Sequence, residues 1–260
     1  LCICYSPIVK GQYFNDFATV DRKAIHIPLS ETYSSAAIAG YMQSNFNTEP
    51  EKLHAIYSWV ITNIRYDKDS MYTINWSMEH EEKISATLRR KKGVCENYAS
   101  VFTDIALKSG FQSFVVSGYT REAGSVNRSG HSWCAVRLGD EWFLCDPTWD
   151  ADSAGNTQYF LVKPGQFVES HFPFDPLWQL LEYPLTEHEF QQFVYRSKKN
   201  SHALNFADSV KAFLQLDSLQ QLEASAHRIR KAGIVNERQK NWLGYKQIQI
   251  GISYGEKDIN

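Results

Sequence analysis

The sequence predicts an α+β protein, in which helices and an antiparallel sheet occupy separate stretches of the chain. Apolar residues recur at helical spacing between residues 33 and 64, between residues 95 and 109, and again from about residue 203. Between these stretches, residues 112–149 contain short alternating runs rich in β-branched and aromatic side chains, as strands do. We therefore expect a helical part, then a sheet, then a helical C-terminal extension.

Composition and charge exclude several classes of protein. The 260 residues are 43% hydrophobic and 22% charged, which is unlike disordered, collagen-like or coiled-coil chains. With 27 basic and 29 acidic residues there is no basic surplus, so no nucleic-acid partner is expected. After the N-terminus no apolar stretch approaches the ~20 residues that span a bilayer, so no integral membrane span is expected.

Residues 1–11 form a short apolar run that contains Cys2 and Cys4. We interpret this run as the end of a secretory signal segment, with cleavage near Gly11, and a buried strand is the alternative. A lipid anchor on either cysteine fits less well, because the flanking residues match a lipobox poorly. This interpretation predicts a secreted, periplasmic or cell-surface protein.

Two helices are predicted before the first candidate site. Residues 33–46 have apolar positions at helical spacing. A second helix begins at Thr48, where Glu51 completes a capping box and Pro50 suits the first turn. Residues 66–92 are polar and lack clear periodicity, so we expect a long loop there.

Residues 95–109 are predicted to form a buried helix that begins with Cys95. The helix macrodipole at this end favours a thiolate. The Cys95 amide has no partner within the helix and could donate to a developing oxyanion. Gly93 would allow a backbone to approach closely. The alternative is that Cys95 is only a small buried hydrophobe.

A hairpin is predicted to bring a histidine and an aspartate together. The dipeptide at 139–140 suits a two-residue turn with glycine first, and this places Cys134 opposite Cys145. Because side chains alternate along a strand, His131 and Asp146 lie diagonally on one face, with backbones about 7–8 Å apart. That geometry lets a carboxylate hold an imidazole in one tautomer. A structural histidine and a turn-forming aspartate are the alternatives.

The same alternation argues against a metal site, and neither metal nor cofactor is expected. His131 and Cys134 point to opposite faces of their strand, and the sequence contains no C-x-x-C pair. Cys134 and Cys145 could form a disulfide or remain two packed thiols. No G-x-S-x-G elbow of a serine hydrolase is present.

The C-terminal third combines an irregular segment with helices. Residues 164–185 are rich in proline and aromatic residues, so we expect an irregular, packed segment. A later helix is predicted to end at Gly233 and to pack its apolar stripe on the domain, rather than to bind a partner. The stripe consists of Leu219, Leu222, Ala226 and Ile229.

The motifs at residues 93–99, 131–133 and 142–149 resemble the transglutaminase-like superfamily of papain-fold cysteine enzymes. Trp59 and residues 63–67 resemble the helix end that precedes the core of that superfamily. Residues 159–161 and 171–181 resemble its kyphoscoliosis-peptidase-like branch. Phe174 departs from the branch pattern, which usually has an acidic residue at this position. The resemblance covers about residues 30–195.

The resemblance implies a papain/transglutaminase-like core, in which a helix with the nucleophile packs on an antiparallel sheet. It assigns residues 12–195 to this domain and leaves residues 196–260 as a helical extension. In the implied chemistry, Cys95 attacks an amide carbonyl and forms a thioester, His131 transfers protons, and Asp146 orients His131. Tyr66 and Trp133 are weak candidates for a second oxyanion donor.

The expected function is peptidase-like hydrolysis of protein or peptidoglycan-type amides, because the resembled branch is described as peptidase-like. The expected partner is a protein or peptide substrate. A protein-crosslinking transglutaminase would share the first half-reaction. A binding module that keeps the fold without catalysis is the third hypothesis.

Overall fold

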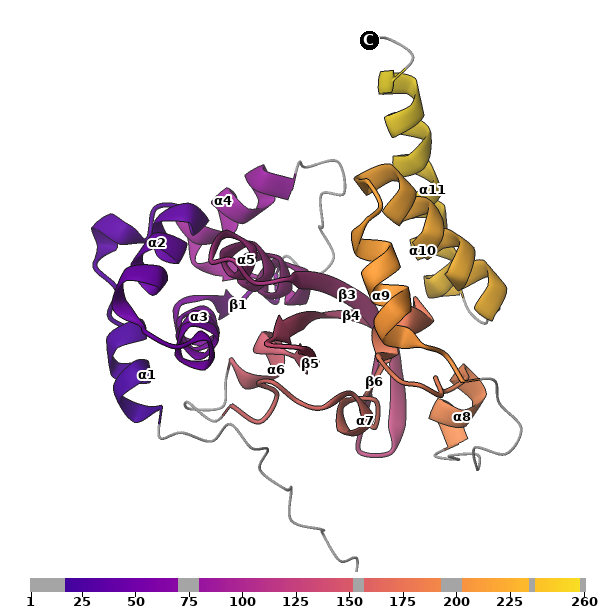
Figure 1. The fold of residues 1–260 in the computed structure, drawn as a ribbon, viewed down its shortest axis with the longest axis horizontal. Helices are drawn as coiled ribbons and strands as arrows, with labels where there is room; N and C mark the ends of the chain where they lie inside the picture. Colours follow the sequence, from indigo (N-terminus) through magenta and orange to yellow (C-terminus); the bar gives the residue numbers. More distant parts are fainter. Residues whose placement is uncertain (1–16, 70–79, 152–156, 193–202, 234–236, 258–260) are drawn as a thin grey trace, which may run out of the picture. The chain divides into compact units, whose positions relative to one another are not determined.

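The computed structural model describes residues 17–69, 80–151, 157–192, 203–233 and 237–257. It divides the chain into two compact units, residues 1–113 with 147–162, and residues 114–146 with 163–260. The predicted α+β class is confirmed, since the first unit is mainly helical and the second contains an antiparallel sheet (Figure 1). The predicted signal segment at residues 1–11 lies outside the described residues. The proposed domain boundary at residue 195 stays a prediction.

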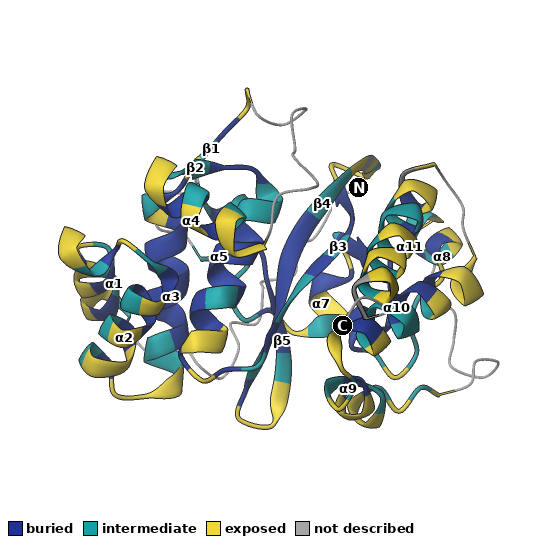
Figure 2. Ribbon diagram, turned by 90° about the horizontal axis from the view of Figure 1, so that it is seen from above, coloured by how far each residue is buried: buried dark blue, intermediate teal, exposed yellow. Residues whose placement is uncertain are grey.

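The helical unit has its core around α3 and α5, which are buried along much of their length (Figure 2). Its two shortest strands, β1 and β2, pair in parallel. The elements are α1 (Ala18–Ala24), the 3-10 helix η1 (Leu29–Glu31), α2 (Ser35–Asn45), α3 (Glu49–Asn63), β1 (Arg65–Tyr66), α4 (His80–Arg90), β2 (Lys92–Gly93), α5 (Cys95–Lys108) and α6 (Pro147–Asp150).

The predicted start of α3 is confirmed in detail. The Thr48 hydroxyl accepts a hydrogen bond from the Glu51 amide at 3.3 Å, and the Glu51 carboxylate accepts one from the Thr48 amide at 3.0 Å. Pro50 lies in the first turn, where its missing N–H has no consequence. The reciprocal bonds satisfy two of the amides that a helix N-terminus leaves without partners.

The prediction of one long loop over residues 66–92 was wrong, because α4 lies within it. Only Ile84, Thr87 and Leu88 are buried on this helix, and charged residues surround them. These positions follow helical spacing, but the many charged residues around them make the segment strongly polar, as a loop would be. The ends of α4 suit the macrodipole, with acidic residues in the first turn and basic residues in the last.

The sheet unit contains four strands in the order β5-β4-β3-β6, and β4 is buried over most of its C-terminal half (Figure 2). The strands are β3 (Ser113–Glu122), β4 (Ser125–Leu138), β5 (Glu141–Cys145) and β6 (His171–Pro173). The remaining elements are α7 (Pro164–Phe167), the 3-10 helix η2 (Pro176–Gln179), α8 (Glu187–Gln192), α9 (Phe206–Leu214), α10 (Ser218–Ala232) and α11 (Glu237–Lys257). The segment expected to be irregular is therefore a series of very short elements.

The register predicted for the hairpin of β4 and β5 is confirmed. Cys134 lies opposite Cys145, and Leu138 lies opposite Glu141. Gly139 has a φ of 59°, the left-handed value that the first turn position requires. The structure carries Cys134 and Cys145 as thiols, and both are fully buried.

The C-terminal helices pack on the sheet of their own unit. Ala226 and Ile229 of α10 are completely buried, which confirms the predicted stripe, and Gly233 ends the helix with a φ of 94°. They join a cluster of buried side chains from the strands and helices of this unit: Tyr119, Phe172, Phe174, Phe190, Ala226, Ile229 and Leu243. None of the helices in the described part of the chain has the length and apolar character of a membrane span.

Gly118 lies where β3 meets β6 most closely. A Cβ atom at this position would lie 2.1 Å from the Phe172 carbonyl oxygen and 2.5 Å from the Trp133 ring. We expect Gly118→Ala to lower the free energy of unfolding by about 1–3 kcal/mol, because the backbone of β6 would have to shift. Urea unfolding measures this loss. Gly165→Ala is the matched control, since a Cβ there meets nothing within 4 Å. Equal stabilities of the two variants would contradict the prediction.

Candidate active site

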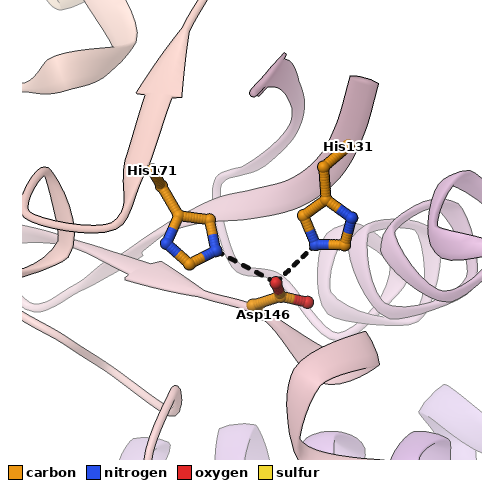
Figure 3. Close-up of side chains that lie close together, drawn as sticks. All are labelled: His131, Asp146 and His171. Carbon is orange, nitrogen blue, oxygen red and sulfur yellow. Dashed lines mark hydrogen bonds and ion pairs between the residues drawn. The ribbon is translucent and has the colours of Figure 1, made fainter. Parts of the chain in front are cut away.

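The sheet unit brings together two of the three predicted site residues. His131 on β4 and Asp146, just after β5, meet through Nε2 and Oδ2 at 2.6 Å (Figure 3). Asp146 is fully buried, and the side chain of His131 is 11% exposed. The diagonal placement predicted from strand alternation is therefore correct, and the imidazole retains limited access to solvent.

A second histidine, which sequence reasoning did not assign to the site, contacts the same carboxylate. His171 lies on β6, and its Nε2 is 3.1 Å from the same Asp146 oxygen (Figure 3). The signal in the sequence was a histidine beside apolar residues in a short run ending at Pro173. Nothing local indicated that this run pairs with β3, where His171 lies opposite Thr120.

Burial and hydrogen bonding act against each other at this cluster. Burial is the largest effect on Asp146 and would raise its pKa, but the two imidazoles together outweigh it and hold the pKa below the usual 3.8. Burial, again the largest effect, lowers the pKa of His171 to about 4 against the opposing attraction of Asp146. Asp146 is therefore an anion at neutral pH, and His171 is neutral.

These charge states assign the ring hydrogens. An ionised carboxylate can only accept, so Nε2 of both His131 and His171 must carry the hydrogen that bonds Asp146. Nδ1 of His171 then accepts from the Ser170 hydroxyl, which lies 2.8 Å away. Nδ1 of His131 points away from the carboxylate (Figure 3). When His131 is neutral, this nitrogen holds the lone pair that a general base needs.

The three side chains also form a possible ligand set for a metal, which the sequence did not predict. Their candidate ligand atoms lie within 4.8 Å of one another. Both Nε2 atoms, however, point directly at Asp146 Oδ2, at hydrogen-bonding distances (Figure 3). A shared ion would need all three atoms to face a common point about 2 Å from each. The observed directions suit two hydrogen bonds rather than coordination.

Cys95 belongs to the other unit, where it is the first residue of α5 as predicted. Its side chain is partly exposed, unlike the fully buried residues that follow on the same helix face. The structure thus places the thiol at a helix N-terminus and pairs His131 with Asp146.

The helix α4, missed from the sequence, holds the N-terminus of α5. Asn97 accepts a hydrogen bond from the Val94 amide at 2.9 Å, and its own amide donates to Thr87 of α4 at the same distance. Glu96 forms an ion pair of 2.6 Å with Lys83 of α4. The turn that presents Cys95 is therefore fixed from two sides by side chains of α4.

The structure also places four other residues that stood out in the sequence. A Cβ on Gly93 would lie 2.5 Å from Cβ of Asn97, so the glycine makes room for that capping side chain. Trp133 is fully buried beside His171, with ring centroids 5.1 Å apart, and its indole N–H has no hydrogen-bond partner among the described residues. Tyr66 stacks on Tyr98 at 6.5 Å. Phe174 is buried in the aromatic cluster of its unit.

The lowered pKa of His171 predicts acid sensitivity of the fold. In the unfolded chain this imidazole titrates near 6.5, so between about pH 6.5 and 4 the unfolded state binds a proton that the folded state excludes. Stability should therefore fall by up to about 3 kcal/mol as pH drops through this range. Asp146 acts in the same direction, but only below pH 3.8.

Urea unfolding between pH 4 and 7.5 measures this effect. His171→Phe is the control, because it fills the same space without a titrating group. Its stability should vary less with pH over this range than that of the wild type. Parallel curves for the two proteins would contradict the assignment.

Comparison with known proteins shows what part of this chain is similar to. Residues 36–147 match the family model of the transglutaminase-like superfamily. The resemblance of this part of the chain to the transglutaminase-like superfamily, seen in the sequence, is therefore confirmed.

Within this superfamily the chain is similar to the kyphoscoliosis peptidase branch. It is 31% identical to human kyphoscoliosis peptidase over 172 residues, which cover 59% of this chain and 25% of the relative. It is 24% identical to hillarin of Drosophila melanogaster over 236 residues, covering 77% of this chain and 28% of the relative. The chain thus spans about a quarter of the length of these relatives.

A solved structure, the periplasmic domain of TgpA from Pseudomonas aeruginosa, is also similar. The two are 15% identical over 55% of this chain and 51% of that chain, with a TM-score of 0.38. A likeness at this level gives no support to a functional comparison.

Proposed function

We propose that the protein is a cysteine-dependent amide acyl-transfer enzyme that hydrolyses protein or peptidoglycan-type amides. The observation that carries the proposal is the buried Asp146 carboxylate fixed on His131 at 2.6 Å, in a domain of a superfamily that is generally enzymatic. Cys95 at the start of α5 supplies the nucleophile. The catalytic residues are therefore Cys95, His131 and Asp146.

The chemistry proceeds in two half-reactions. Nδ1 of His131 removes the proton of the Cys95 thiol, and the sulfur attacks the amide carbonyl carbon. The tetrahedral intermediate collapses to a thioester when the C–N bond breaks and the imidazolium protonates the leaving amine. In the second half-reaction His131 removes a proton from water, and the resulting hydroxide attacks the thioester. The acid leaves and Cys95 regains its proton.

Asp146 orients His131 and stabilises the imidazolium that His131 becomes during the reaction. Its carboxylate holds the Nε2–H of His131, so Nδ1 stays available to the thiol. The same negative charge favours the imidazolium that forms when the thiol gives up its proton. The amide of Cys95, at the positive end of α5, is the proposed donor to the oxyanion.

Two alternative functions remain to be compared with hydrolysis. One is a crosslinking enzyme with a different acyl acceptor, and the other is a binding module that catalyses no reaction. A crosslinking transglutaminase would admit a primary amine in place of water to the same thioester. A binding module has no use for a carboxylate buried with two imidazoles, because burying such a charge costs free energy that a packed apolar core avoids. The retained charge cluster therefore favours catalysis over binding alone. A cell-surface, periplasmic or secreted location remains our proposal for where this chemistry occurs.

Alkylation of Cys95 with iodoacetamide at pH 6 tests the proposal. Because Cys134 and Cys145 are fully buried, faster labelling of Cys95 alone could reflect exposure. The decisive comparison is His131→Asn, which leaves the exposure of Cys95 but removes its base. We expect the rate of Cys95 labelling in this variant to fall at least about tenfold, because a thiol without a basic partner is mostly protonated at pH 6. Equal labelling rates in the two proteins would contradict the proposal that His131 acts as the base for Cys95.

A further inference from the structure

We propose that His171 is a positioning residue, which fixes Asp146 so that Asp146 can in turn orient His131. The proposal extends the function proposed above and rests on it for its catalytic consequence. Its basis is the shared oxygen: Oδ2 of Asp146 accepts from His131 at 2.6 Å and from His171 at 3.1 Å (Figure 3). Two strands that are not neighbours in the sheet, β4 and β6, thus direct a histidine at one atom.

His171 adds a restraint on this carboxylate from a second strand. Asp146 lies just beyond the last residue of β5. Its contact with His131 on β4 and its contact with His171 on β6 reach the same oxygen from two directions, so the second donor limits the rotation of the carboxylate that the first would permit. The strand β6 is itself held in register on β3, with Phe172 opposite Tyr119.

The surroundings of His171 keep its ring in place and neutral. Phe167 stacks on the imidazole with ring centroids 3.9 Å apart, and Trp133 meets it edge-on. The Asp146 carboxylate can only accept, so the hydrogen of the neutral ring lies on Nε2, and Nδ1 faces the Ser170 hydroxyl 2.8 Å away. The titratable groups that act on His171 are Asp146 and His131.

A neutral donor suits this position better than a cation would. A lysine or arginine here would neutralise Asp146 and repel the imidazolium that His131 forms during catalysis, since the two rings are only 6.0 Å apart. A neutral imidazole restrains the oxygen and leaves its charge available to His131. His171 therefore has the properties of an orienting group, and it does not itself contact the reacting atoms.

Two variants separate the N–H donor from the ring that fills the core. His171→Phe keeps the shape and removes the donor. His171→Gln restores an N–H at about the distance of Nε2 from the backbone. The readout is the ¹⁵N NMR spectrum of the His131 ring at a pH where it is neutral, in histidine-labelled protein. The chain has eight histidines, so the signals of His131 and His171 are identified by their loss in His131→Asn and His171→Phe.

We expect His131 to be a single tautomer with its hydrogen on Nε2 in the wild type and in His171→Gln. In His171→Phe both tautomers should be present. We also expect kcat to fall about tenfold or more in His171→Phe with KM little changed, and to recover in His171→Gln, because a misplaced base slows the chemical step rather than binding. The NMR result does not depend on activity, so a failure of the proposed function and a failure of this inference are distinguishable.

Three results would overturn the inference. The first is an unchanged His131 tautomer in His171→Phe. The second is equal disturbance by both variants, which would assign the effect to packing. The third is a hydrogen on Nδ1 of His171 in the wild-type protein, a measurement that remains decisive if His171→Phe does not fold.

Discussion

Replacing Cys95 with alanine is expected to abolish both amide hydrolysis and amine incorporation while the fold is retained. No other group on the proposed reaction path can form the thioester, so the rate should fall at least about 10⁴-fold. Alanine is a good helix former, and the side chain of Cys95 is partly exposed at the first position of α5. The loss of stability should therefore stay within about 1 kcal/mol.

Cys134→Ala provides the matched control. This thiol is fully buried on the face of β4 opposite to His131, so its removal should cost stability and spare the reaction. Release of acid from a peptide amide and incorporation of a fluorescent primary amine into casein measure the two outcomes in parallel. Activity that persists in Cys95→Ala and disappears in Cys134→Ala would show that the nucleophile has been assigned wrongly. Amine incorporation much faster than hydrolysis would favour the crosslinking alternative.

The parts of the site that could be predicted depend on local rules. A two-residue turn at Gly139 sets the register of β4 and β5, and strand alternation then puts His131 and Asp146 on one face. The start of α5 is equally local, because the helical pattern and the first-turn position of Cys95 are both contained in one short segment. These two segments were enough to indicate a cysteine, histidine and aspartate site.

The parts that were missed depend on contacts between segments far apart in the chain. His171 reaches Asp146 only because β6 pairs with β3 across a long intervening segment, and no turn sequence encodes that pairing. The helix α4 is strongly polar overall, as a loop would be, yet Thr87 and Lys83 on it hold the first turn of α5. Sequence periodicity reports which face of an element is buried. It does not report which distant element covers that face.

Substitutions of Asp146 should separate the orienting role of this residue from its charge. Asp146→Ala leaves the N–H groups of His131 and His171 without their acceptor, so His131 can adopt the wrong tautomer. We expect kcat/KM to fall about 10³–10⁴-fold. Asp146→Asn keeps one oxygen that can accept both N–H groups but removes the charge. An asparagine can impose the wrong tautomer on a histidine through its NH₂ group, but here two N–H groups converge on one oxygen and favour the asparagine oxygen at that place. The loss should therefore be about 10–10²-fold, the value of a hydrogen bond to a charged group over that of a neutral one.

The relative activities of Asp146→Asn and Asp146→Ala distinguish the orienting role of Asp146 from its charge. If Asp146 mainly orients His131, the asparagine variant will be far more active than the alanine variant. It will also require a higher pH for rapid alkylation of Cys95, because an uncharged partner stabilises the imidazolium less. If the charge dominates, the two variants will be about equally inactive. An alanine variant within tenfold of the wild type would contradict any role for Asp146 in the reaction, and the 2.6 Å contact would then be structural only.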